Sequence, residues 1–196
     1  MPRKKSVRKS ATDFKAEADA IAAFVATAKQ NLTEQHVSWA YEYGILRLYR
    51  EFEALMLDAL VGAINNETAT LTTRTGITFP KHLTDEVCEF LIIGNGYFDF
   101  KGRDGLIKTL KDYVPAGHYL VTAVKKDKYK DSLEQLSALR NFAAHDSEVA
   151  KMRVKEAVDQ ERMPEAGSWL KKQGRLESLI RRLKELADEI YAATPY

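Results

Sequence analysis

TEQHVSWAYEYGILRLYREFEALMLDALVGAIN, residues 33–65, repeats apolar side chains at the spacing of a helix over about eight turns. The repeating positions are Val37, Tyr41, Ile45, Leu48, Phe52, Leu55 and Ala59. A helix of this length typically forms the spine of a helical bundle. The stretch therefore favours an all-α fold.

The apolar patterns on both sides of this spine also have the period of a helix. They predict helices over residues 11–30, with a cap at Thr12 and Asp13, and over 84–94, 106–114, 131–145 and 175–193. Residues 65–81 are Thr-rich, which predicts a long loop that could hold a short hairpin, and a charged segment continues to residue 160. Because strand-like alternation is nearly absent, we predict an all-α bundle of five to seven helices.

The composition indicates one domain with a basic N-terminal end. The chain has 196 residues, of which 45% are hydrophobic, and its net charge of +2 neither demands nor excludes a nucleic-acid partner. Five of the first nine residues are Arg or Lys. We expect residues 1–10 to form a disordered basic tail, either a solubilising end or an electrostatic anchor for RNA or DNA, and residues 11–196 to form a single helical domain.

Cysteine content and hydropathy argue against several classes of protein. Cys88 is the only cysteine, which rules out an internal disulfide framework, and without paired Cys and His spacings we expect no metal site and no cofactor. Acidic residues ahead of the apolar segment 20–28 argue against a signal peptide, and no apolar run reaches the length of a membrane span. The expectation is a cytoplasmic protein without a membrane partner.

The predicted helix 131–145 carries polar residues suited to phosphate chemistry. Its expected core face consists of Leu133, Leu136, Leu139 and Ala143. Asn141 and His145 fall together on the opposite side, with Arg140 on the flank. That side also carries the small residues Ser137, Ala138 and Ala144, which suggest that another backbone approaches closely. A solvated helix face without function is the competing interpretation.

LRNFAAHDS, residues 139–147, resembles the R-x(4-6)-H signature of the HEPN superfamily, matched by Arg140, Asn141 and His145. Residues 46–60 and 167–190 are similar in outline to the subgroup called RiboL-PSP-HEPN. The resemblance implies a HEPN-like helical bundle that acts as a homodimeric, metal-independent ribonuclease.

In that chemistry the 2′-hydroxyl of the RNA substrate attacks the neighbouring phosphate. His145 is expected to act as general acid or base, Arg140 to stabilise the phosphate, and Asn141 to orient either one. DNA lacks the 2′-hydroxyl and should survive. Since one subunit supplies a single such histidine, two copies of His145 across a two-fold axis could serve as acid and base, and the small residues would permit this approach.

Several other residues are candidates for supporting roles. Glu53 resembles the family's helper carboxylate, with Tyr49 one turn before it, and an ordinary exposed glutamate is the alternative. Asp146 could cap or orient His145 or simply begin the next turn. Ser147 stands where some relatives have a tyrosine, so regulation by nucleotidylation of that residue is not expected. A basic run could track the RNA backbone, or be a solvated loop, through Lys125, Lys126, Lys128 and Lys130.

Three hypotheses follow for the function. The first is an endoribonuclease that acts as a growth-arresting toxin or a phage-defence effector, restrained by an antitoxin or another regulatory protein. The second is a catalytically silent HEPN-like module that binds RNA or a protein partner. The third is a structural helical dimer in which the motif is coincidental.

Overall fold

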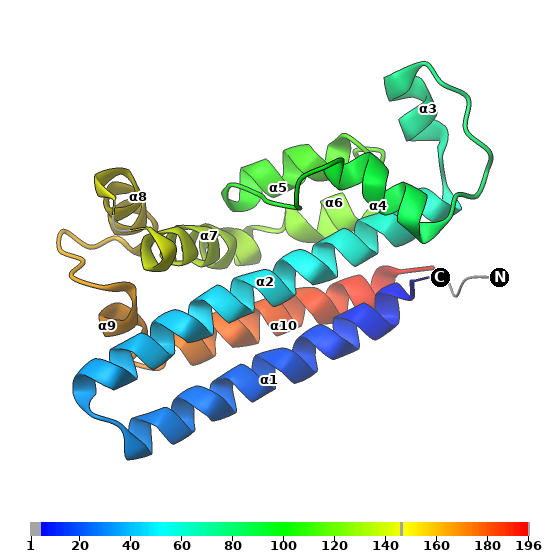
Figure 1. The fold of residues 1–196 in the computed structure, drawn as a ribbon. Coiled ribbons are helices and arrows are strands. Elements are labelled where there is room, and N and C mark those ends of the chain that lie inside the picture. The colour runs from blue at the N-terminus through cyan, green and yellow to red at the C-terminus, as the bar shows by residue number, and fades with distance from the viewer. Residues whose placement is uncertain (1–4, 146, 196) are drawn as a thin grey trace.

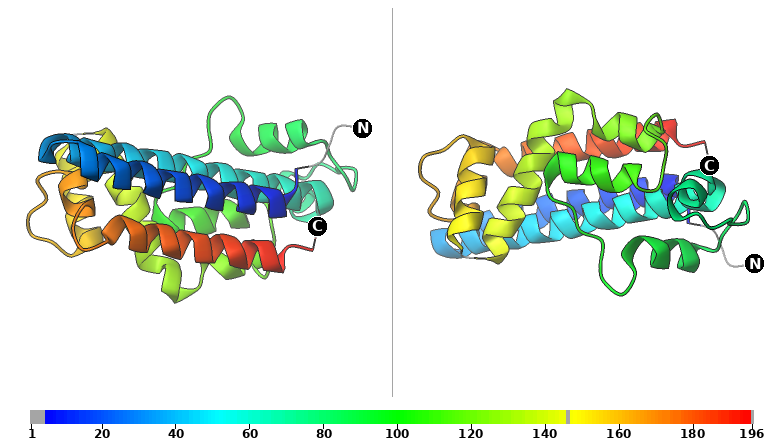
Figure 2. Two further views of the ribbon diagram at one scale, coloured as in Figure 1. Left: turned by 90° about the horizontal axis from the view of Figure 1, so that it is seen from below. Right: turned by 90° about the horizontal axis from the view of Figure 1, so that it is seen from above.

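The computed structural model describes residues 5–145 and 147–195, and every regular element in these residues is a helix (Figure 1). Three long helices lie side by side along the molecule: α1 (Val7–Asn31), α2 (Glu34–Asn66) and α10 (Arg175–Ala193) (Figures 1 and 2). The first two run antiparallel, and α10 runs in the same direction as α2. This long layer is the frame on which the other helices pack.

The long helix α2 is the spine of the fold, as the sequence predicts. All seven positions of its apolar repeat are buried. Nearly every residue from Leu55 to Asn65 is buried, because α1 covers one side of the helix and shorter helices cover the other. Gly44 allows α1 to approach closely, since a Cβ at this position would lie only 3.2 Å from the side chain of Val25. In the described part of the chain, no helix has both the length and the apolar surface that a bilayer crossing requires.

Shorter helices form a second layer, most of it on the side of α2 away from α1 (Figure 1). In chain order they are α3 (Ala69–Thr75), α4 (Asp85–Ile93), α5 (Gly102–Lys111), α6 (Tyr119–Val124), a 3-10 helix (Asp127–Tyr129), α7 (Lys130–Ala144), α8 (Glu148–Val158) and α9 (Ala166–Leu170). α7 packs against α2, while α5 and α8 pack against α7. Phe52 joins the two layers, because its ring meets both Phe14 of α1 and Phe100 before α5 at centroid distances of 5.8 Å.

The prediction of five to seven helices was too low, since the described residues form ten α-helices and one 3-10 helix. α3 occupies part of the predicted loop 65–81, which is fully described and contains no hairpin. α6 and α9 are too short to produce a recognisable period. α8 lies in the segment that the sequence marks as charged, and its buried residues Ala150, Val154 and Val158 follow a helical spacing that the surrounding charges obscure.

The N-terminal prediction was wrong for the part that the structure describes. α1 begins at Val7 after an N-cap at Ser6, so residues 7–10 are helical and the predicted cap at Thr12 and Asp13 lies inside the helix. Val7 is fully buried and extends the apolar stripe of α1 by two turns, a signal that the surrounding basic residues hide. The Lys5 ammonium forms ion pairs with one carboxylate of α2 and one of α4. Residues 1–4 lie outside the described residues.

Candidate functional site

Helix α7 carries the three residues of the sequence motif at its C-terminal end. Its core face is buried as predicted, with Leu133, Leu136 and Leu139 fully inaccessible to solvent. Arg140 and Asn141 lie half-buried in the last turn, and His145 is the C-cap residue. The packing of the leucines therefore fixes where the last turn points its polar side chains.

The guanidinium of Arg140 is held by two neighbours. One terminal nitrogen, Nη1, donates a hydrogen bond to Oδ1 of Asn141 at 2.7 Å. The guanidinium carbon also lies 4.8 Å from the centre of the Tyr49 ring on α2, a cation–π distance. Only one of the five N–H groups of the guanidinium is used in the hydrogen bond to Asn141. The other N–H groups stay available to an anion such as a phosphate.

Tyr49 is a buried platform beneath this guanidinium. Its side chain is 2% exposed, and its ring stacks on Phe100 with centroids 5.0 Å apart. Its hydroxyl is within hydrogen-bond distance of Oδ1 of Asp99 (2.8 Å) and the carbonyl oxygen of Phe100 (2.9 Å), and donates its single proton between them. Burial, reinforced by the hydrogen bond to Asp99, raises the pKa of Tyr49 well above its ordinary value. Tyr49 therefore remains neutral at any physiological pH.

Glu53 lies on the same side of α2, one turn after Tyr49, and is half-buried. Burial raises the pKa of the Glu53 carboxyl to about 7, with the charge of Asp99 adding to the rise, against opposing effects of Arg140 and the Tyr49 hydroxyl. Its Oε1 atom is buried and accepts no hydrogen bond from the described residues. The proton of Tyr49 goes to Asp99 and Phe100, which leaves Glu53 without a strong donor. Glu53 can therefore gain or lose a proton near neutral pH, within electrostatic reach of Arg140.

His145 is placed differently from what its helical spacing suggests. Its backbone is extended, with φ −139° and ψ 109°, so the angular position expected for a helical residue does not apply to it. Its backbone N–H donates to the carbonyl of Asn141 at 2.9 Å, while its side chain is exposed. No hydrogen bond from the described residues reaches the imidazole, so the structure joins Arg140 to Asn141 but shows no bond that fixes the His145 side chain beside them. Asp146, the other supporting candidate here, lies outside the described residues.

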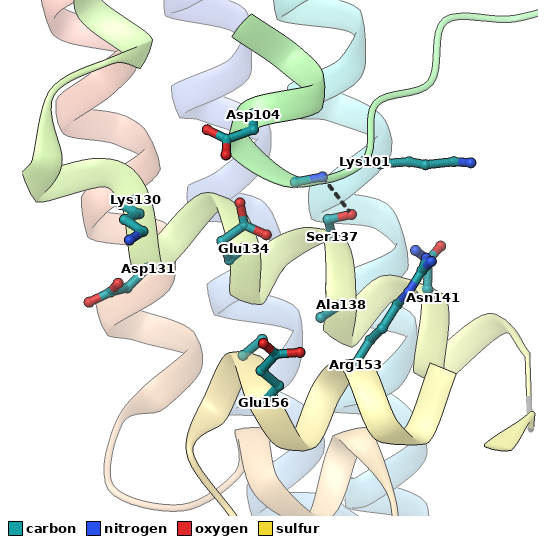
Figure 3. A pocket seen from close by; sticks show the side chains of 12 residues that line it. Lys101, Asp104, Lys130, Asp131, Glu134, Ser137, Ala138, Asn141, Arg153 and Glu156 are labelled. Atoms are coloured by element: carbon teal, nitrogen blue, oxygen red, sulfur yellow. Dashed lines mark hydrogen bonds between the residues drawn. The ribbon is translucent and has the colours of Figure 1, made fainter. Parts of the chain in front are cut away.

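The small residues of α7 are covered within the same chain. Ser137 and Ala138 are buried, and the Ser137 hydroxyl accepts the backbone N–H of Gly102 at 3.2 Å (Figure 3). One residue on, the backbone N–H of Arg103 donates to the Glu134 carboxylate at 2.8 Å. The expected close backbone is therefore the start of α5, and at these two positions the face expected to meet a second subunit is occupied. Ala144, beside His145, is exposed.

A cavity of about 690 Å³ lies between α5, α7 and α8 (Figure 3). Asn141 and Ala138 of α7 line it together with Arg153 of α8, whereas Arg140 and His145 do not. The cavity thus begins directly behind the Arg140–Asn141 pair. Neither the cavity nor Arg153 follows from the sequence, because α5 and α8 are brought to α7 only by the fold.

The basic run before α7 serves mainly structural contacts. Lys126 and Lys128 both form ion pairs with Glu189 of α10, at 2.8 and 2.5 Å. Lys125 is exposed and its carbonyl accepts a hydrogen bond from Arg103, while Lys130 lines the cavity. Of the four lysines proposed to track RNA, only Lys130 borders the candidate site.

Tyr49 and Glu53, both named from the sequence, do lie beside Arg140, whereas Asp99 and Phe100 carry no sequence signal of a role in the site. Among the described residues, His, Cys, Asp and Glu side chains form no group of three suited to hold a metal ion. Comparison of the chain with protein-family models, with curated proteins and with solved structures gives no significant match. The function of the site is therefore argued from its own chemistry.

Proposed function

We propose that the protein is a metal-independent endoribonuclease of HEPN-like type. The observation that carries the proposal is the Arg140–Asn141 pair, oriented over Tyr49 at a helix end that also presents an exposed imidazole, His145. A guanidinium with free N–H groups can stabilise the charge on a phosphate, and an imidazole can move the proton that phosphodiester transfer needs.

In the proposed reaction the 2′-oxygen of a ribose bonds to the adjacent phosphorus while the bond to the 5′-oxygen of the next nucleotide breaks. His145 takes up the 2′-hydroxyl proton or returns a proton to the leaving 5′-oxygen, a role that typically contributes ~10²–10⁴-fold in rate. Arg140 stabilises the charge that develops on the phosphate oxygens. The products are a 2′,3′-cyclic phosphate and a free 5′-hydroxyl.

Glu53 and Tyr49 support Arg140 from α2 in this proposal. The ring of Tyr49 fixes the plane of the guanidinium. Because the pKa of Glu53 is raised to about 7, this carboxyl is largely neutral at slightly acidic pH and competes weakly with a phosphate for the guanidinium. At higher pH the ionised carboxylate attracts Arg140 more strongly. Cleavage should therefore weaken as pH rises above neutrality.

The proposed enzyme is a homodimer, because in a concerted displacement the base and the acid act at the same moment, and a second His145 could take the role that the first does not. The exposed Ala144 and His145 leave this end of α7 open to a second copy. We place such an enzyme in the cytoplasm, as a toxin or defence effector restrained by an antitoxin or regulatory protein.

A catalytically silent module that binds RNA or a protein partner is the second candidate. It is favoured because no hydrogen bond from the described residues positions the His145 imidazole, and a site that only binds phosphate needs no positioned imidazole.

The test is cleavage of single-stranded RNA by the purified protein in excess chelator, with DNA of the same sequence as control. Arg140→Ala and His145→Ala should each lower the rate by about 100-fold or more. Arg162→Ala and His36→Ala, which remove exposed residues of the same types elsewhere, should leave it unchanged. If the wild type binds RNA without cutting it, the silent module is correct instead.

A further inference from the structure

The cavity behind Asn141 is built from three helices and is strongly polar. Its volume of about 690 Å³ lies in the range of small-molecule sites. Its charged lining consists of Lys101, Lys130 and Arg153 against Asp104, Asp131, Glu134 and Glu156. Because this lining carries both cations and carboxylates, it suits a single nucleotide, whose phosphate meets a cation and whose base offers hydrogen-bond donors.

The anionic group has a defined place at the end of the cavity next to the motif. Arg153 extends toward Asn141 in Figure 3, and both line the cavity. The Arg153 side chain is exposed and forms no ion pair or hydrogen bond with the described residues. Asn141 in turn accepts from Arg140, so two guanidinium groups flank a single amide. A phosphate bound here would meet Arg140 from one side and Arg153 from the other.

The opposite part of the cavity offers free hydrogen-bond acceptors. The Glu134 carboxylate is engaged by the start of α5, which leaves three carboxylates without a partner among the described residues. They are Asp104, Asp131 and Glu156, one from each of the three helices. A carboxylate recognises a pair of adjacent N–H donors in a planar group through two parallel hydrogen bonds. Among the RNA bases, only guanine presents such a pair, its N1–H and its exocyclic amine.

The start of α5 gives this part of the cavity a fixed wall. Gly102 has φ +65°, and a Cβ at this position would collide with the Glu134 carboxylate. The two hydrogen bonds from Gly102 and Arg103 to α7 hold the wall in place. The fixed wall sets the shape of this part of the cavity, and the preference between bases comes from the exposed carboxylates beside it.

We propose that this cavity binds the guanosine on the 5′ side of the cleaved bond, with Arg153 holding its 3′-phosphate and one of the free carboxylates binding the guanine edge. This inference rests on the proposed ribonuclease function and adds to it a base preference and a second phosphate-binding arginine. It predicts that the enzyme cuts after guanosine.

Binding can be measured without cleavage. Isothermal titration calorimetry of the full chain with guanosine 3′-monophosphate and uridine 3′-monophosphate compares two ligands that share the phosphate and differ in the base. We expect the guanosine nucleotide to bind about tenfold or more tightly than the uridine nucleotide. Arg153→Ala should weaken both by about tenfold. Combined Asp104→Asn, Asp131→Asn and Glu156→Gln substitutions should remove the difference between the bases and retain the uridine nucleotide's affinity.

The controls are Arg162→Ala and Glu161→Gln, which change exposed residues of the α8–α9 connection and should alter neither affinity. All of the substituted side chains are exposed, and thermal melting verifies that each variant is folded. Equal affinity for the two nucleotides, or full affinity in Arg153→Ala, would overturn the inference. Guanosine 3′-monophosphate binding in a protein that never cuts RNA would leave the cavity assignment intact and defeat the ribonuclease proposal. RNA cleavage without a guanosine preference would leave the ribonuclease proposal intact and defeat the cavity assignment.

Discussion

The long layer of α1, α2 and α10 and the shorter layer of α5, α7 and α8 are built on different principles. In the long layer, apolar side chains repeat with helical spacing and the contacts are between buried hydrocarbon surfaces. The short layer shares this apolar core, through residues such as Leu106, Leu136 and Val154, but polar groups add to its contacts. The Gly102 and Arg103 N–H groups bind Ser137 and Glu134, and the Arg140 cation of α7 covers the Tyr49 ring of α2. The two layers therefore differ in the backbone and cation contacts that the short layer adds to apolar packing.

The largest effect should come from breaking the junction between the layers. Phe52→Ala removes a ring that is fully buried and touches aromatic rings of both layers, so we expect a loss of about 3–5 kcal/mol in the free energy of unfolding. Phe24→Ala on α1, where the ring is 47% exposed, should cost less than about 1 kcal/mol. Urea denaturation measures both. Similar losses of unfolding free energy in Phe52→Ala and Phe24→Ala would contradict the role of Phe52 in joining the two layers.

The next effect concerns the polar contacts of the short layer. Gly102→Ala combines a positive φ with a collision against Glu134 and should cost about 2–4 kcal/mol. Gly76→Ala is the matched control, since its φ is +70° and nothing lies near its missing Cβ, so it should cost about 1–2 kcal/mol from backbone strain alone. Thermal unfolding of both variants separates collision from strain. An equal loss of stability in Gly102→Ala and Gly76→Ala would mean that the α5–α7 contact is not tight.

A smaller effect should appear in the dependence of stability on pH. The pKa of Glu53 is raised in the folded protein from 4.5 to about 7, so the folded state binds this proton more tightly than the unfolded chain. The resulting stabilisation is complete below the unfolded value and is lost as pH rises through about 7. Between pH 5 and 8 we expect a loss of about 1–3 kcal/mol in the wild type that Glu53→Gln abolishes. Glu51→Gln, two residues away, should keep the wild-type dependence.

The smallest effect should come from the basic run before α7. Lys126 pairs with Glu189 on α10, away from the cavity, so Lys126→Ala should change the affinity for single-stranded RNA by less than about twofold. Lys130→Ala, which removes a cation of the cavity lining, should weaken RNA binding more. Fluorescence anisotropy with labelled RNA measures both. A larger loss of RNA affinity in Lys126→Ala would mean that Lys126 does belong to the RNA-binding surface.

The same contrast between layers decides what the sequence could predict. The apolar repeat of α2 and the three leucines of the α7 core face follow from spacing along one helix and are confirmed, whereas Ala143, predicted on the same face, is only half-buried. Gly102 and Asp99 acquire their partners only when α5 and its preceding turn are brought to α7 and α2, contacts that no local pattern encodes. The extended backbone of His145 did not follow from helical spacing for a third reason: the helix ends one residue before it.

The central claim is that Arg140, Asn141 and His145 cleave RNA through attack by the neighbouring 2′-hydroxyl. The most direct measurement uses an RNA oligonucleotide with a single 2′-deoxy residue on the 5′ side of a mapped cleavage site, compared with the all-ribose sequence in excess chelator. We expect the all-ribose strand to be cut there to a 2′,3′-cyclic phosphate and the substituted strand to stay intact at that bond. Cleavage of the substituted bond, or no cleavage of either strand, would contradict it.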